Sequence, residues 1–329
     1  MKIIDIHFNV KRIPLIESYN LSYKTLNYYD SIVVEIVIGN DKLLGEVTPL
    51  VGYTDETIED VLKELSAVRE KIINEELSFA LSVLKKRVNQ NNSFALSSLI
   101  PQIERQIDID LVFNKLELGN SELVYSLKIE NEFDNLQEII NSIVDKGYNT
   151  VKIKVGKDIL REIKFVKKLK TINLKNLHIR FDANGGFSYE QSCDFLRALE
   201  CISTNTDYLE QPVCRSGWED LEKLVKEKFK VPIMIDESIY TLSDIRKSYD
   251  IGAKFVKIKL CKYGSLQHLQ EALDYAISLD LKVVFGNGVA TDISNYYEIE
   301  FYQRNKDKIF GAIESVGFMK IKNKLFFKI

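Results

Sequence analysis

The stretch from residue 151 to 315 constrains the fold most, because one pattern recurs in it seven times. Each repeat is a short apolar, β-branched run that ends in polar residues and precedes a helix-like segment. The runs are VKIKVG (151–156), IRFDANGG (179–186), YLEQP (208–212), IMIDES (233–238), VKIKLCK (256–262), VVFGNG (283–288) and GAIES (311–315). Taken at Lys154, Asp182, Glu210, Asp236, Lys259, Gly286 and Glu314, the spacings are 28, 28, 26, 23, 27 and 28 residues. This is about the length of one strand, one helix and two loops.

Regular alternation of buried strands and helices predicts a parallel sheet with helices outside it. So many units favour closure into a barrel over an open sheet. Residues 123–129 (LVYSLKI) are predicted as the first barrel strand, followed by a helix at about 133–146. We therefore expect an α/β barrel over residues 119–329, ending in a hairpin at 319–329 around Asn323-Lys324.

The first 118 residues carry a different pattern, three strands followed by helices. Strands are predicted at 2–10, 31–38 and 43–48, and helices from Glu56, at 76–88 and at 93–106. The polar, tyrosine-bearing stretches 14–24 and 51–56 are predicted as loops. This part is expected to form a separate N-terminal α+β domain, 1–118.

Residues that cap helices mark several predicted helix starts. Thr54 or Asp55 is expected to cap the helix after Pro49. In the barrel, Ser188, Ser216 and Ser265 are expected to do the same.

Composition excludes several classes of protein. The net charge is −3, from 45 basic and 48 acidic residues, and no basic stretch carries interleaved aromatics, so no nucleic-acid partner is expected. The apolar runs are too short to span a membrane, the N-terminus lacks the features of a signal peptide, and the four cysteines show no CxxC spacing. We expect a cytoplasmic protein without membrane partners or zinc. A homo-oligomer is left open.

Lysines occupy an unusual place in two of the predicted strands. In VKIKVG, Lys152 and Lys154 share one face, and Lys257 and Lys259 repeat this arrangement four strand units later. Barrel strands are normally apolar on both faces, so interior lysines need carboxylates or a metal-bound anion as partners. A solvated pair on a surface strand is the plainer interpretation of one KxK, but not of two copies across a barrel.

Between these lysines, three consecutive strands end in carboxylates: Asp182, Glu210 and Asp236. Three carboxylates without His or thiolate form a hard oxygen site suited to Mg²⁺, with Mn²⁺ as an alternative. Asn184 and Glu237 are expected to complete or orient that site. Each acid alone is equally compatible with a helix cap or a turn.

Taken together, KxK, DAN, LEQP, DES and the second KxK resemble the enolase superfamily, in its muconate-lactonizing subgroup. The resemblance covers most of the chain. It implies a modified (β/α)7β barrel, an N-terminal α+β capping domain, and Mg²⁺-assisted removal of a proton α to a substrate carboxylate through an enediolate. It also implies that residues 14–24 and 51–56 close over the substrate.

The resemblance implies roles for individual positions. Lys154 matches the catalytic lysine of the second barrel strand, Lys152 its auxiliary, and Lys259 the lysine on the opposite face of the substrate. Asp182, Glu210 and Asp236 match the metal ligands. Expected substrate contacts are Tyr19, Tyr23, Tyr53, Gly286, Asn287, Gly288 and Glu314. A base near neutral pH also requires a lysine pKa lowered by burial and by a neighbouring cation.

Three interpretations remain open for the small carboxylate substrate. The first is a racemase or epimerase of an N-acyl amino acid or related amide. The second is β-elimination or cycloisomerisation, as in o-succinylbenzoate synthase or muconate cycloisomerase. The third is a ligand-binding relative without activity. Some relatives that epimerise dipeptides carry DxD in the last strand, whereas this chain has Glu314 alone in GAIESVG. His7, His178 and His268 lie outside the motifs, which disfavours a histidine base.

Overall fold

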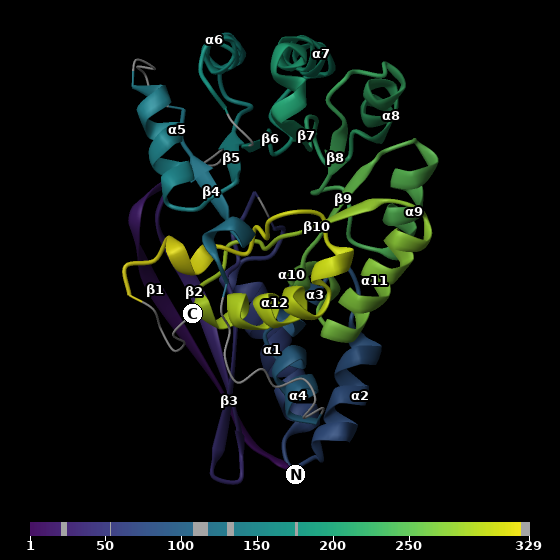
Figure 1. Cartoon of the computed structure of the whole chain (residues 1–329). Helices are drawn as coiled ribbons and strands as arrows, with labels where there is room; N and C mark the ends of the chain where they lie inside the picture. Colours follow the sequence, from purple (N-terminus) through teal and green to yellow (C-terminus); the bar gives the residue numbers. More distant parts are fainter. Residues whose placement is uncertain (21–24, 53, 108–117, 130–134, 175–176, 324–329) are drawn as a thin grey trace.

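The computed structural model describes residues 1–20, 25–52, 54–107, 118–129, 135–174 and 177–323. Two parts are visible in Figure 1, an antiparallel sheet with helices at its side and a curled parallel sheet with helices outside. The N-terminal elements are β1 (Ile3–Asn20), β2 (Thr25–Ile38), β3 (Asp41–Val47), α1 (Ile58–Ile72), α2 (Leu77–Arg87), α3 (Ser93–Leu96) and α4 (Ile100–Ile107). Both the expected barrel architecture and the antiparallel N-terminal sheet are confirmed.

The parallel sheet has the order β10-β9-β8-β7-β6-β5-β4. Its strands are β4 (Val124–Leu127), β5 (Thr150–Lys154), β6 (His178–Asp182), β7 (Thr206–Glu210), β8 (Ile233–Ile235), β9 (Phe255–Ile258) and β10 (Lys282–Phe285). The helices are α5 (Leu136–Asp145), α6 (Ile159–Leu169), α7 (Tyr189–Leu199), α8 (Trp218–Lys226), α9 (Leu242–Asp250), α10 (Leu260–Tyr263), α11 (Leu266–Ser278) and α12 (Asp292–Arg304).

The last predicted strand, GAIES, closes the ring through isolated bridges. Ile313 bridges to Leu123 beside β4, and Glu314 bridges to Gly286 after β10. The segment therefore joins the two edges of the seven-stranded sheet, as the eighth strand of a (β/α)7β barrel does.

Two separate apolar cores support the two parts. One is formed by residues of β1–β3 with α1–α4, and the other by the barrel strands with the surrounding helices. Barrel residues such as Val151 and Ile153 are fully buried, while Lys152 and Lys154, which alternate with them along β5, point to the other face. The alternation that predicted interior lysines is thus present in the strand.

The loops after β5 and β6 meet backbone to backbone, which requires glycine. Gly156 has φ +99°, and a Cβ placed there would lie 2.6 Å from the carbonyl oxygen of Ala183. A Cβ on Gly186 would lie 2.5 Å from the carbonyl oxygen of Gly156. These contacts fix the distance between the two strand ends that carry Lys154 and Asp182.

Several local predictions are confirmed and others are wrong. Ser188 and Ser265 cap α7 and α11, but Gly217 precedes α8, so the prediction for Ser216 is wrong. The cap of α1 is Thr57, which forms a capping box with Asp60, so Thr54 and Asp55 were placed too early.

The expected loop at 14–24 is also wrong in its first half. β1 runs through to Asn20 and pairs with β2 beyond Pro14, because Leu15 and Tyr29 bury apolar surface on one face of a long hairpin. Residues 21–24 lie outside the described residues.

At the C-terminus, residues 320–322 run antiparallel to β1. The second arm of the predicted hairpin, 324–329, lies outside the described residues. The hairpin and the domain boundary at 118/119 remain predictions.

Candidate active site

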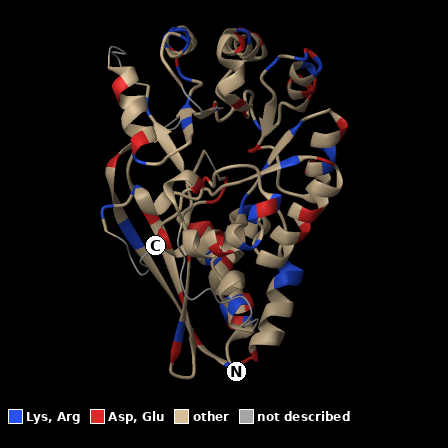
Figure 2. Ribbon diagram, viewed as in Figure 1, with Lys and Arg blue, Asp and Glu red and all other residues tan. Residues whose placement is uncertain are grey.

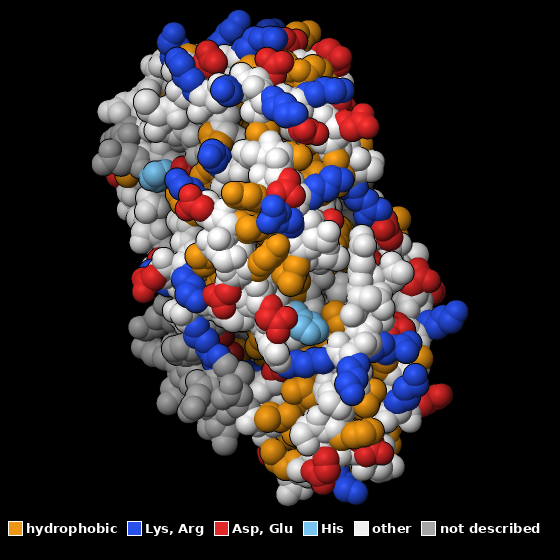
Figure 3. All heavy atoms as spheres, turned by 90° about the vertical axis from the view of Figure 1, so that its right-hand side faces the viewer, with side chains coloured by type: hydrophobic (Ala, Val, Ile, Leu, Met, Phe, Trp, Pro, Cys, Tyr) orange, Lys and Arg blue, Asp and Glu red, His pale blue; other side chains and the backbone are white. Residues whose placement is uncertain are grey.

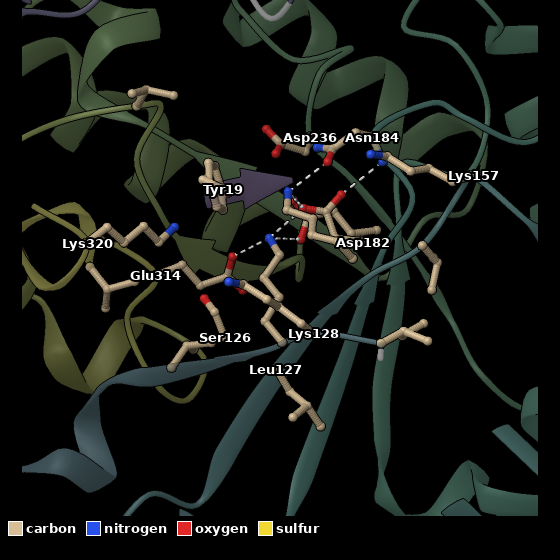
Figure 4. Close-up of a pocket in the computed structure, with 18 of the residues that line it drawn as sticks. Tyr19, Ser126, Leu127, Lys128, Lys157, Asp182, Asn184, Asp236, Glu314 and Lys320 are labelled. Atoms are coloured by element: carbon tan, nitrogen blue, oxygen red, sulfur yellow. Dashed lines mark hydrogen bonds and ion pairs between the residues drawn. The ribbon is translucent and has the colours of Figure 1, made fainter. Parts of the chain in front are cut away.

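The polar strand ends lie side by side because the register of the parallel sheet aligns them. Lys154 is the register partner of Asp182, and Asp182 is the partner of Glu210. These residues and Asp236 line a cavity of about 310 Å³ at the carboxyl ends of the strands (Figure 4). In parallel barrels this is the end where active sites form. The cavity also contains Lys152, Lys257, Lys259, Glu314, Tyr19 and Lys320.

Near the cavity, Lys154 and Lys259 each contact one of the predicted metal ligands. Lys154 Nζ lies 2.5 Å from Asp182 Oδ2 and 2.7 Å from Asn184 Oδ1. Lys259 Nζ lies 2.6 Å from Asp236 Oδ2. We call Lys154, Asp182, Asn184, Asp236 and Lys259 the outer charge layer.

The expected lowering of the Lys154 pKa is not found. Burial lowers the pKa of Lys154, but Asp182 and the other anionic groups around it together raise it by more, so the net pKa lies above its usual value. The pKa of Lys259 is raised in the same way by Asp236 against the effect of burial. Both lysines are therefore held as ammonium ions as long as these carboxylates face them.

Two residues earlier on each strand, Lys152 and Lys257 lie deeper in the barrel. Lys152 Nζ contacts Glu210 Oε2 at 2.7 Å and Glu314 Oε2 at 2.6 Å. Lys257, only 1% exposed, lies 2.7 Å from Glu210 Oε1 and 2.5 Å from Glu314 Oε2. With buried Arg180, which lies 3.0 Å from Glu314 Oε1, these residues form what we call the inner charge layer.

Glu314 therefore has partners other than those expected of a substrate contact. Its Oε1 accepts hydrogen bonds from Arg180 and from the Tyr208 hydroxyl, and its Oε2 accepts from both inner lysines. Every acceptor position of this carboxylate faces a side chain of the protein. Burial raises the pKa of Glu314, but the charges of Lys152, Lys257 and Arg180 lower it well below its usual value.

The donor set fits Mg²⁺ in its chemistry. Asp182, Glu210 and Asp236 are buried carboxylates, and Glu237 Oε2 beside them is buried without a hydrogen-bond partner. Among the described residues, however, the acids are not drawn together into a metal-binding cluster. Three carboxylates repel one another without a cation, and here lysine ammonium groups neutralise them instead.

The two residues expected to orient the acids do contact each other. Asn184 Nδ2 donates to Glu237 Oε1 at 2.8 Å, while the backbone N–H of Asn184 donates to Asp182. Asn184 has φ +45°, a left-handed conformation that asparagine tolerates better than most residues. The bend turns its amide toward Lys154.

The expected substrate contacts have mixed outcomes. Tyr19, Asn287 and Gly288 line the cavity, whereas Tyr23 and Tyr53 lie outside the described residues. Gly286 is not a cavity residue. A Cβ there would lie 3.2 Å from Lys257 Cδ, so Gly286 leaves room for an inner lysine.

Backbone N–H groups at the N-terminus of α12, near Asn287 and Gly288, bind a carboxylate of the chain itself. The N–H groups of Thr291 and Ser294 donate to Glu46 Oε1, and the Thr291 hydroxyl donates to Glu46 Oε2. Glu46 belongs to β3. The helix begins at Asp292 with Thr291 as its N-cap, and the anion at this end is therefore a side chain of the protein.

Sequence reasoning missed several residues of this region. Lys262 Nζ lies 2.9 Å from Asp236 Oδ1, and Arg180 joins the inner layer beside Lys257, which was predicted only as an interior lysine. Gln211 holds the ends of β7 and β8 together, because its Oε1 accepts from the Asp236 N–H and its Nε2 donates to Ser238. The sequence feature that could have pointed to these residues is a polar side chain inside or shortly after an apolar strand.

The three histidines do not line the cavity. His178, at the start of β6, is exposed and contacts Asp207. No helix in the described ranges has the length and apolar character needed to cross a bilayer. On the face shown in Figure 3, basic and acidic side chains are interspersed, and Figure 2 shows both signs over both parts of the fold.

Comparison with known proteins places these features among related chains. A family model described as Enolase C-terminal domain-like matches residues 135–307. An L-Ala-D/L-Glu epimerase of Francisella tularensis subsp. novicida is 27% identical over 301 residues, covering 87% of this chain and 82% of that protein. An N-succinyl-L-Arg/Lys racemase of Bacillus cereus is 25% identical over 342 residues, covering 97% and 88%.

Among solved structures, a dipeptide epimerase from Enterococcus faecalis, complexed with Mg and the dipeptide L-Leu-L-Tyr, superposes with a TM-score of 0.83. It is 20% identical and covers 98% of this chain and 93% of its own. The similarity supports the same fold for the whole described chain.

Proposed function

The chain belongs to the Enolase C-terminal domain-like family and is an enzyme of the enolase superfamily, and on that premise we propose that it is a racemase or epimerase. Its substrate is an N-acyl amino acid or a related amide, and the proton removed lies α to the carboxylate. Lys154 and Lys259 are the two acid–base groups.

One observation carries this proposal: two lysines from β5 and from the end of β9 line the same cavity, each against a different acid. β6, β7 and β8, which end in the three carboxylates, lie between them in the sheet. A substrate carbon held at these acids has one lysine on each side. One lysine removes the proton, and the other returns a proton to the opposite face.

Asp182, Glu210 and Asp236 would hold Mg²⁺. The ion supplies positive charge that stabilises the negative charge developing on the substrate carboxylate. Lys154 removes a proton only when its amine is neutral, so its ion pair with Asp182 must loosen before it acts as the base. Lys152, 12% exposed in its side chain and bound to three carboxylates, stays charged and orients Glu210.

A second candidate is one-base elimination or cycloisomerisation. It is favoured by the different exposure of the two lysines, because the side chain of Lys154 is 25% exposed and that of Lys259 only 4%. In that reaction Lys259 remains a fixed cation.

The experiment that tests the proposal is deuterium uptake at the α-carbon from D₂O, followed by NMR and by chiral analysis. The panel consists of N-acyl amino acids, dipeptides and succinylbenzoate precursors, with Mg²⁺ present. Uptake accompanied by inversion of an N-acyl amino acid is the expected result. Turnover of a succinylbenzoate precursor without racemisation of any amino acid derivative would favour the second candidate instead.

A further inference from the structure

Lys320 enters the cavity from outside the barrel strands. It directly follows the short helix η5 (Gly317–Met319), and its side chain points toward the cavity in Figure 4. Its Nζ lies 3.8 Å from the centre of the Tyr19 ring, over the ring face. Residues from both ends of the chain thus meet above the catalytic lysines.

Lys320 differs from the four lysines of the two charge layers. Lys152, Lys154, Lys257 and Lys259 each lie within 3 Å of a carboxylate. Lys320 forms no ion pair with a carboxylate of the described residues. Burial lowers its pKa and, although Tyr19 raises it, the charge of Lys154 lowers it further, so the net pKa lies below its usual value. An ammonium ion that is desolvated beside other cations costs free energy, which an anion would offset.

The backbone around Lys320 is fixed on both sides. The N–H of Ile16 donates to the Lys320 carbonyl oxygen at 2.8 Å, and the N–H of Lys322 donates to that of Pro14 at 3.1 Å. The N–H of Phe318 donates to Asn295 Oδ1 at 2.8 Å. The lysine is therefore held in place by β1 and α12, as a preorganised binding residue must be.

We propose that Lys320, positioned over Tyr19, binds a second anionic group of the substrate, a carboxylate distinct from the one at the reacting carbon. This inference rests on the proposed function, because it assumes a substrate carboxylate at the acids. The aromatic face of Tyr19 holds the ammonium by a cation–π contact and leaves its N–H donors for the ligand.

A second carboxylate can come from either end of the substrate. It can end the acyl group, as in N-succinylalanine, or the amino acid side chain, as in N-acetylglutamate. For both there is a counterpart of the same shape in which a neutral amide replaces only the second carboxylate, namely N-succinamoylalanine and N-acetylglutamine. The anionic and the neutral member of each pair are named after this second group. The pair whose anionic member loses most kcat/KM when Lys320 is changed identifies which end of the substrate carries the second carboxylate.

The test compares Lys320→Gln with Lys322→Gln in the full-length enzyme with Mg²⁺. Lys322 is exposed on the same segment and serves as the matched control. We expect Lys320→Gln to lower kcat/KM for the anionic member of one pair about tenfold to hundredfold, the range for one charged hydrogen bond. The neutral member should change less than about twofold, and Lys322→Gln should leave both unchanged.

Binding of the four compounds, measured by calorimetry, separates this inference from the proposed function. If no compound exchanges its α-proton but the wild type prefers an anionic member and Lys320→Gln does not, the proposed reaction fails and the anion site stands. Equal losses for the anionic and neutral members, no loss at all, or no binding of any of the four would overturn the site.

Discussion

The outer and inner charge layers each contain two lysines, one from β5 and one from the β9 segment, paired with carboxylates, yet their surroundings differ. In the inner layer, Lys257 and Arg180 are 1% and 0% exposed, and Glu314 has protein partners at both oxygens. In the outer layer, Lys154 faces the cavity with a quarter of its side chain exposed. A shift of two residues along a strand separates a lysine enclosed by acids from one that can reach a ligand.

The difference shows what an ion pair can do at each depth. A buried charge whose partners are all internal has little freedom to change protonation, because each change leaves the other charges uncompensated. A charge beside an open cavity can exchange its partner for a substrate. We therefore assign positioning to the inner layer, apart from the metal ligand Glu210, and chemistry to the outer layer, and four experiments can break this assignment.

The largest expected effect is that of metal removal, which acts on Asp182 and Asp236 of the outer layer and on Glu210, whose carboxylate also contacts both inner lysines. Exhaustive chelation should reduce turnover of the racemised substrate below detection, and Mg²⁺ should restore it, because carboxylates alone cannot stabilise a developing negative charge. Activity is measured by chiral analysis. Full turnover after chelation would remove the metal assignment of Asp182, Glu210 and Asp236.

Replacement of the outer lysines should have the next largest effect. Lys154→Ala and Lys259→Ala should each lower racemisation by about 10²–10⁴-fold, the usual contribution of a general base. Each variant should still exchange the α-proton of one enantiomer with D₂O, and the two variants should select opposite hands. Lys154→Arg keeps the charge but not the base, since guanidinium does not deprotonate in proteins. Unchanged turnover of both enantiomers in either alanine variant would contradict two-base chemistry.

The inner layer should show its effect mainly in stability. Glu314→Gln leaves Lys152, Lys257 and Arg180 without their shared carboxylate, and we expect a loss of about 3–5 kcal/mol in the free energy of unfolding. Denaturant titration measures it. Asp274→Asn, which breaks a half-exposed pair with Lys308, is the control and should cost less than about 1 kcal/mol.

This stability effect should depend on pH in a defined direction. Because the folded pKa of Glu314 is lowered, its contribution is complete above the unfolded pKa of about 4.3 and is lost as the pH falls toward the folded pKa. The gap between wild type and Glu314→Gln should therefore be constant near neutral pH and shrink in acid. A gap that widens in acid would contradict the ion-pair account.

Much of the barrel could be predicted from the sequence because its strands repeat a strong local signal. The apolar runs and the polar residue ending each run follow from strand alternation, which needs no knowledge of tertiary contacts. The long hairpin of β1 and β2 could not be found this way. Its residues beyond Pro14 are polar on one side and gain their order by pairing across the hairpin.

Within the site, the sequence predicted that Lys154, Asp182 and Lys259 would lie at neighbouring strand ends, but not the partners of Glu314 and Lys320. That Glu314 turns inward to four donors depends on Arg180 and Tyr208, which lie on neighbouring strands and carry no motif. The position of Lys320 could not be predicted either, because it lies over Tyr19 only through the pairing of residues 320–322 with β1. Contacts between distant segments decide these cases, and one sequence does not display them.

Glu46 reaches from β3 to the first turn of α12, 245 positions further along the chain. Contacts this distant in sequence slow folding, since a large loop must close before they form. During synthesis the N-terminal sheet must wait, with a carboxylate destined for burial still in water, until almost the whole barrel has left the ribosome. Only then does the N-terminus of α12 gain the Glu46 carboxylate as its hydrogen-bond acceptor, so the two parts of the chain complete their folding together.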